Sequence, residues 1–205
     1  TWSEYVVPNS TGCVHMNVEK RSDGSLFAMF RSRWADWIYM SQSQDNGRTW
    51  SEPIPTTLPN NNSSIQFTKL KNGHLAVVFN NRNAAADTVR RASLYDEIKD
   101  DETEQTPAAV EQNHSEKRTA FWGTPRAPLT IAVSEDDGNT WPYMRDLETG
   151  DGYCLTNNSK EGLNREYSYP SIQQTNDGII HITYTYFRQY IKYVCITEDW
   201  VRGGS

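Results

Sequence analysis

Apolar residues along this chain gather in short runs bounded by turn residues, and one such run recurs three times. Each copy begins with Asp-Gly or Asn-Gly and places an aromatic residue six positions after the glycine, in the pairs Gly24 and Phe30, Gly73 and Phe79, and Gly178 and Tyr184. These dipeptides favour tight hairpin turns because Asp, Asn and Gly tolerate positive φ. A second strand-like segment precedes each turn, at residues 14–18, 65–70 and 171–174. The pattern therefore predicts three antiparallel hairpins in one register.

A second repeat interleaves with the first. The pattern Ser-x-Asp-x-Gly-x-Thr-Trp occupies residues 43–50 and 134–141. Its Asp can accept hydrogen bonds from the backbone N–H groups of a turn, so Asp45 and Asp136 are interpreted as structural rather than catalytic carboxylates. Third strands, at residues 37–41 and 129–133, lead into these turns. A repeating unit of three or four antiparallel strands is typical of a propeller blade, which spans ~40–50 residues.

Residues 1–205 are predicted to form one all-β domain, a β-propeller of which about four blades are present. Four blades cannot close a ring, so we expect further blades from missing sequence or from another chain. The start, Thr1-Trp2-Ser3-Glu4, resembles the end of an intact Ser-x-Asp motif, which predicts an incomplete N-terminus. Residues 83–124 lack the repeating strand pattern and are interpreted as a surface insertion, partly helical around 89–98. It is either a solvated loop or a loop over the rim of the active face.

Composition narrows the function. The formal net charge is −6 and no basic stripe is present, which argues against a nucleic-acid partner. No apolar run approaches the ~20 residues of a membrane-spanning helix. Three cysteines without CxxC spacing indicate neither a zinc site nor a disulfide framework, so no metal or cofactor is expected. The compartment stays open, with a secreted or periplasmic location as the working expectation.

Taken together, these motifs resemble the sialidase (neuraminidase) superfamily, whose Asp-box repeats decorate a six-bladed β-propeller. The resemblance is most specific in residues 126–141 and 166–172, and it covers most of the chain outside residues 83–124. In that family three arginines clamp the substrate carboxylate and a tyrosine is the nucleophile. The resemblance therefore implies a glycoside hydrolase that acts on a sialic or uronic acid glycan, an anionic partner.

The family's functional residues carry over to three positions. Arg31 follows a strand and precedes an Asp-box, like the second family arginine, and Arg126 opens the strand before the next Asp-box, like the third. Tyr169 stands where the nucleophile stands. The first arginine and the aspartate acid/base belong to blades upstream, and this sequence offers no candidate for either. We also expect Tyr184, Arg188 and Asn62 to contribute to substrate binding.

One position departs from the family pattern. Sialidases pair the tyrosine with a glutamate, and the corresponding place here falls on His15. Related propellers that cleave rhamnose–uronate or ulvan-type linkages rely on a histidine. Because a phenol has a pKa near ~10, Tyr169 needs a group that takes its proton, and His15 with an intrinsic pKa near ~6.5 can serve.

Three functions stay open on the sequence alone. The first is a sialidase-type glycosidase with Tyr169 as nucleophile and His15 as its base. The second is a polysaccharide lyase or rhamnosidase-like enzyme, in which arginines neutralise a uronate carboxylate and His15 or Tyr169 abstracts the adjacent proton. The third is a non-catalytic propeller that binds a glycan or a protein. The two enzymatic functions require Arg31, Arg126, His15 and Tyr169 to lie together at one end of the propeller.

Overall fold

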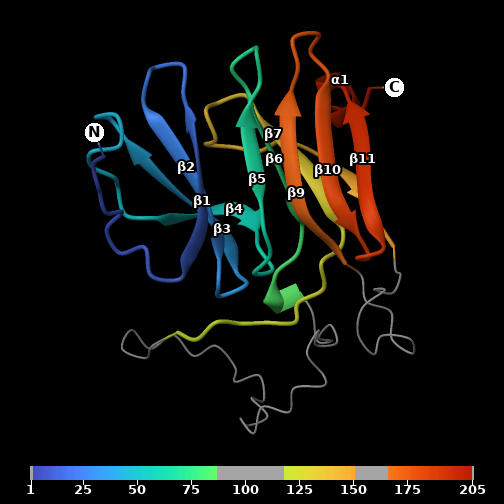
Figure 1. Ribbon diagram of the computed structural model, residues 1–205, viewed down its shortest axis with the longest axis horizontal. Coiled ribbons are helices and arrows are strands. Elements are labelled where there is room, and N and C mark those ends of the chain that lie inside the picture. Colours follow the sequence, from blue (N-terminus) through green and yellow to red (C-terminus); the bar gives the residue numbers. More distant parts are fainter. Residues whose placement is uncertain (1, 87–117, 151–165, 205) are drawn as a thin grey trace, which may run out of the picture.

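The computed structural model describes residues 2–86, 118–150 and 166–204, and Figure 1 shows their course. The part of the predicted insertion at residues 89–98 lies outside this range. Within the described part, residues 84–86 form a short 3-10 helix, η1 (Ala84–Ala86), and residues 118–125 run along the lower end of the first two sheets in Figure 1. No helix in the described ranges has the length and apolar character needed to cross a membrane.

Three antiparallel sheets make up the fold. The first has the order β1-β2-β3-β4 and the second β5-β6-β7-β8, whereas the third is three-stranded, β11-β10-β9. The strand bounds in the first sheet are β1 (Cys13–Lys20), β2 (Leu26–Ser32), β3 (Trp37–Ser43) and β4 (Ile54–Pro59). The second sheet contains β5 (Gln66–Lys69), β6 (Leu75–Asn80), β7 (Leu129–Ser134) and β8 (Tyr143–Glu148). The third contains β9 (Tyr167–Gln174), β10 (Ile180–Tyr186) and β11 (Tyr190–Ile196), followed by α1 (Glu198–Val201).

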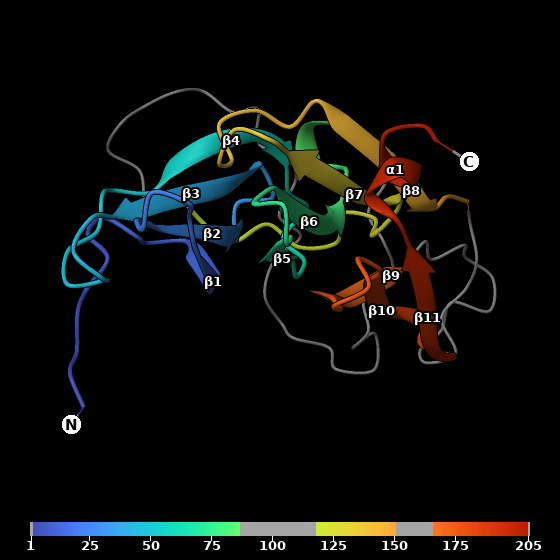
Figure 2. The same ribbon diagram turned by 90° about the horizontal axis from the view of Figure 1, so that it is seen from above.

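The sheets stand side by side like blades. Figure 2 looks along them and shows β4 and β8 on the outer side, with β5 between β1 and β9; β5 contacts both of these strands. The all-β propeller architecture predicted from the sequence is thus present, and the described residues contribute three sheets to it.

Two apolar clusters hold neighbouring blades together. Phe27 of the first blade meets Phe67 of the second edge to face, with ring centroids 5.8 Å apart, inside the first cluster. The second cluster joins the second and third blades and includes Ile131, Ile182 and Tyr184. Burial of these side chains is the main stabilising term, since a fully buried large apolar side chain contributes about 1.5–3 kcal/mol.

Both Asp-box turns form as the sequence predicted. In the first, Asp45 accepts hydrogen bonds from the Thr49 N–H and hydroxyl, each at 2.8 Å, and from the Ser43 hydroxyl at 2.9 Å. The second repeats these contacts around Asp136. Gly138 has φ +88° and lies against Phe27, where a Cβ would come within 2.7 Å of the ring. Glycine is therefore required there by both backbone and packing.

Candidate active site

The blade topology brings distant parts of the sequence to one end of the sheets. In an antiparallel meander the first strand begins, the second ends and the third begins at the same end. His15 lies near the start of β1, Arg31 near the end of β2, and Arg126 just before β7. Tyr169 lies near the start of β9 and Arg188 just after β10. All five predicted residues therefore lie at the same end of their blades.

Two β-bulges present His15 and Tyr169. The pairing of β1 with β2 shifts between Val14 and Asn17, and the pairing of β10 with β9 shifts between Thr183 and Thr185. Each bulge holds its residue at φ +54°, a left-handed conformation that costs a non-glycine residue about 1–3 kcal/mol. Such residues cluster at functional sites because the surrounding structure must enforce them.

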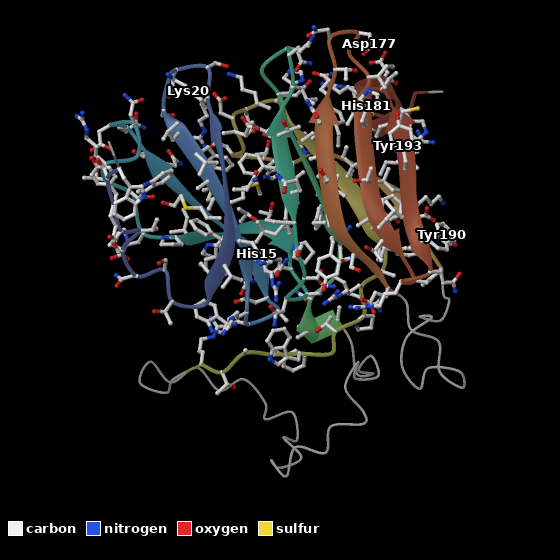
Figure 3. The ribbon with its side chains drawn as sticks, viewed as in Figure 1. His15, Lys20, Asp177, His181, Tyr190 and Tyr193 are labelled. Carbon is white, nitrogen blue, oxygen red and sulfur yellow. The ribbon has the colours of Figure 1, made fainter. Side chains whose placement is uncertain are left out.

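A cleft of about 330 Å³ separates the two bulges. His15 and Tyr169 line it from the first and third blades, and Ser64 lines it from the second. The three positions are equivalent, since each lies nine residues before the turn glycine of its own blade. The Ser64 hydroxyl is 3.4 Å from Nδ1 of His15. Figure 3 labels His15 on β1, at the side of the sheet that faces the second blade.

Behind Tyr169, one carboxylate joins two arginines. Glu166 is fully buried, and its Oε1 accepts a hydrogen bond from Arg126 Nη1 at 3.1 Å and from Arg188 Nε at 2.9 Å. Nη2 of Arg188 lies 2.8 Å from the same oxygen. A parallel bridge between Arg126 and Glu166 brings the two residues together in the backbone as well. Charged hydrogen bonds of this kind are short and strong, so the two guanidiniums are firmly oriented.

This pair of arginines sets the electrostatics of Tyr169. The Arg126 guanidinium lies 5.5 Å from the centroid of the Tyr169 ring, which is itself 53% exposed. Partial burial on its own would raise the pKa of Tyr169. Hydrogen bonding and charge from Arg126, and then from Arg188, outweigh this effect, so the pKa of the phenol is lowered below its usual value near ~10. The two arginines thus make the phenol of Tyr169 more acidic.

Arg31 is held differently. Its Nε donates to Oδ1 of Asn62 at 2.9 Å, and its guanidinium lies 5.9 Å from the ring of Trp122. Burial, followed by the positive charge of Arg126, lowers the pKa of Arg31, although arginine stays protonated at neutral pH. Within the described ranges Arg31 contacts a neutral amide and an aromatic ring, so its positive charge remains available to an anionic ligand.

Asn62 therefore has a positioning task. It is 2% exposed and holds φ +59°. Its Oδ1 accepts from Arg31, and its Nδ2 donates to the carbonyl oxygen of Phe121 at 2.8 Å. Asn62 was expected to contribute to substrate binding. In the structure its amide fixes the orientation of Arg31 instead.

The environment of His15 favours the neutral imidazole. Burial first, and then the charge of Arg31, lower the pKa of His15 from about 6.5. At neutral pH the ring can therefore accept a proton.

Tyr184 was predicted to bind substrate, but in the structure it lies in the core. It is 1% exposed, and its hydroxyl donates to Glu148 rather than reaching the cleft. The cause is strand alternation, because Tyr184 shares a face of β10 with buried Ile180 and Ile182. Burial, then the hydrogen bond to Glu148, raise the pKa of Tyr184, so it remains a neutral core residue.

A cluster of possible metal ligands lies away from the cleft. His74, Glu135 and Glu198 bring their ligand atoms within 4.8 Å of one another. Arg202 pairs with both glutamates, at 2.6 Å in the case of Glu198. The guanidinium supplies the positive charge that a metal ion would bring, and it ties α1 to the second blade.

Two residues at this end of the blades, Glu166 and Trp122, were not predicted from the sequence to have a role. Glu166 was part of the stretch that carried the resemblance, but nothing in its spacing indicated that it bridges Arg126 and Arg188. Trp122 lies in a segment without strand periodicity. The equivalence of Ser64 with His15 and Tyr169 was available from the sequence, because all three precede a turn glycine by nine positions.

Comparisons with solved structures agree with this fold. The leech intramolecular trans-sialidase matches with a TM-score of 0.60 at 14% identity over 98% of this chain. A Hadza microbial sialidase gives 0.59 at 16% identity over 92%, and the intramolecular trans-sialidase from Ruminococcus gnavus gives 0.54 at 16% over 91%. These alignments cover 26%, 28% and 33% of the respective structures, so the chain spans about a third or less of each. The shared fold is the sialidase-type β-propeller.

Comparison with curated proteins gives no significant match. The sequence profile of the BNR repeat-like domain, by contrast, matches residues 1–182, which is most of the chain. The chain therefore belongs to the family of BNR repeat-like domains.

Proposed function

We propose that this chain carries part of a glycoside hydrolase active site that acts on a sugar with a carboxylate, a sialic or uronic acid. The observation that carries the proposal is the environment of Tyr169. Its phenol stands at the edge of the cleft, and Arg126 and Arg188 lower its pKa. A tyrosine in such a setting is suited to nucleophilic attack, because a phenolate is a far better nucleophile than a phenol.

The sign of the charges explains why tyrosine suits this substrate. A carboxylate nucleophile would repel an anionic sugar, whereas a phenol carries no charge until it ionises. In the proposed step the Tyr169 oxygen bonds to the anomeric carbon and the glycosidic bond breaks. The leaving oxygen takes a proton from solvent. Water then hydrolyses the glycosyl–tyrosine and releases the sugar.

Arg31 is the proposed anchor for the carboxylate, together with Arg126. A guanidinium matches a carboxylate with two parallel hydrogen bonds. Arg126 already shares Glu166 with Arg188, but Arg31 is held by neutral groups. In the part of the chain that the structure describes, Glu166 is the carboxylate that pairs with Arg126 and Arg188, which leaves excess positive charge near Tyr169 that an acidic sugar would neutralise. One structural relative was determined with oseltamivir carboxylate, which is compatible with such a site.

His15 supports a second candidate, β-elimination by a polysaccharide lyase. Its pKa is lowered, so it is neutral and basic at pH 7, and it lies across the cleft from Tyr169. If the arginines neutralise a uronate carboxylate, the proton next to that carboxylate becomes more acidic. His15 would accept this proton while the bond to the leaving oxygen breaks, which gives an unsaturated uronate.

A substrate panel with three variants tests the proposal. The assays are release of a fluorescent aglycone from a sialoside or a uronide, and absorbance of an unsaturated uronate. The hydrolase proposal predicts that Tyr169→Phe lowers kcat at least 1,000-fold, an order of magnitude typical of losing a nucleophile, while His15→Ala has a smaller effect. The lyase alternative predicts the reverse order and an absorbance signal.

Tyr193→Phe is the matched control, since Tyr193 is similarly exposed and lies on β11, away from the cleft (Figure 3). Equal rates in wild type and Tyr169→Phe would refute the nucleophile. Binding of acidic sugars without turnover of any substrate would favour the non-catalytic propeller.

A further inference from the structure

We propose that Trp122 forms a second sugar subsite, a stacking platform for the unit next to the acidic sugar. This inference rests on the proposed function, because it places the carboxylate of the first sugar at Arg31. Trp122 is 52% exposed, and its ring is next to the Arg31 guanidinium. An aromatic face beside a carboxylate-binding arginine is suited to a glycan, since sugar rings present apolar C–H groups that pack on indole.

The backbone around Trp122 is fixed by residues of the site itself. The Phe121 N–H donates to the Arg33 carbonyl at 2.8 Å, and the Phe121 carbonyl accepts from Asn62 Nδ2 at 2.8 Å. A little further on, Asn61 Nδ2 donates to the Pro125 carbonyl at 2.8 Å. Residues on both sides of Trp122 are therefore hydrogen-bonded to the loop before β5, and this holds the backbone that carries the exposed indole in place.

Asn62 couples the two binding groups. Its Oδ1 holds Arg31, while its Nδ2 holds the residue next to Trp122. A single buried amide thus sets the spacing between the guanidinium and the indole. A ligand that places a carboxylate on Arg31 meets Trp122 at a fixed offset, which is the geometry that preorganised binding requires.

The occupant is a neutral or weakly charged sugar ring, and not a second acidic unit. Trp122 offers an apolar face, and the nearby guanidinium is already assigned to the first carboxylate. Packing within the protein does not account for the residue, since about half of its surface stays open while Phe121 and Thr124, on the same segment, are partly or fully buried.

Binding measurements test this subsite independently of turnover. The full chain carrying Tyr169→Phe is titrated calorimetrically with the acidic monosaccharide and with a disaccharide that adds one neutral unit. We expect Trp122→Ala to weaken disaccharide binding about tenfold, the effect of losing one aromatic contact, and to leave monosaccharide affinity unchanged. Trp122→Phe should retain most of the affinity. Tyr193→Ala, an equally exposed aromatic residue on β11, is the control and should change neither affinity.

Each outcome is decisive. Equal disaccharide affinity in the parent and in Trp122→Ala overturns the subsite while leaving the acidic-sugar site intact. An equal loss for both ligands also overturns it, because it would assign Trp122 to the positioning of Arg31. Failure of the parent to bind either ligand overturns the proposed function together with the subsite.

Discussion

Replacement of Glu166 by glutamine separates the electrostatic account of Tyr169 from a purely structural one. Glu166 is fully buried and pairs with Arg126 and Arg188, whose side chains are 10% and 22% exposed. Glutamine keeps the shape and an acceptor oxygen but removes the negative charge. Breaking a buried ion pair from one side costs about 3–5 kcal/mol. We expect about 3 kcal/mol here because Arg188 retains some contact with water.

In a chain of this size, a loss of that magnitude lowers the melting temperature by roughly 6–12 °C. The pKa of Tyr169 should fall in this variant, whereas disorder of the site would raise it. With Glu166 neutral, the arginines present more net positive charge to the phenol, so the pKa of Tyr169 falls further. If the variant merely loosened the site, the pKa would rise toward its usual value.

The measurement is a spectroscopic pH titration of phenolate absorbance. The chain has eleven tyrosines, so each curve is taken as a difference from the same protein carrying Tyr169→Phe. Glu148→Gln is the matched control, because Glu148 is also largely buried and accepts from Tyr184 and Lys192 away from the cleft. It should lose stability and leave the pKa of Tyr169 unchanged. A rise in that pKa in Glu166→Gln would refute the electrostatic account.

Two further predictions concern residues outside the cleft. Hydrogen bonds from the Thr49 backbone and side chain lower the pKa of Asp45 to about 2, so this carboxylate stabilises the fold above its unfolded pKa of about 4 and stops doing so as pH falls through about 2. The stability gap between wild type and Asp45→Asn, measured by urea unfolding, should therefore close between about pH 4 and pH 2; a gap that stays constant would contradict the Asp-box account. Tyr184→Phe removes a hydrogen bond to Glu148 and should lower the free energy of unfolding by about 1–2 kcal/mol. It should leave kcat/KM unchanged. A tenfold loss of activity at unchanged stability would instead show that Tyr184 acts in the active site.

The inner and middle strands were largely readable from the sequence. Turn dipeptides and the Asp-box motif predicted the segment 129–133, which lies within β7, and the segment 171–174, which lies within β9. Outer strands carry weaker signals. β4 reads Ile-Pro-Thr-Thr-Leu-Pro and contains two prolines, which the sheet tolerates because β4 is an edge strand with its N–H groups partly unused.

The site was only partly readable. The resemblance to the sialidase family placed His15 and Tyr169 at the site, and both line one cleft. The role of Glu166 depends on a bridge to Arg126, forty positions earlier, and local spacing carries no information about such a contact. Tyr184 was assigned to the site because of the resemblance to the sialidase family, whereas strand alternation turns it into the core.

The most direct test of the central claim is to trap the sugar on Tyr169. The full chain is incubated with a fluorinated acidic glycosyl fluoride, which forms the glycosyl–enzyme bond quickly and hydrolyses it slowly, and is then digested and analysed by mass spectrometry. The account predicts an added sugar mass on the peptide that contains Tyr169, and none in Tyr169→Phe. Turnover of an acidic glycoside without such an adduct, or an adduct on another residue, would contradict it.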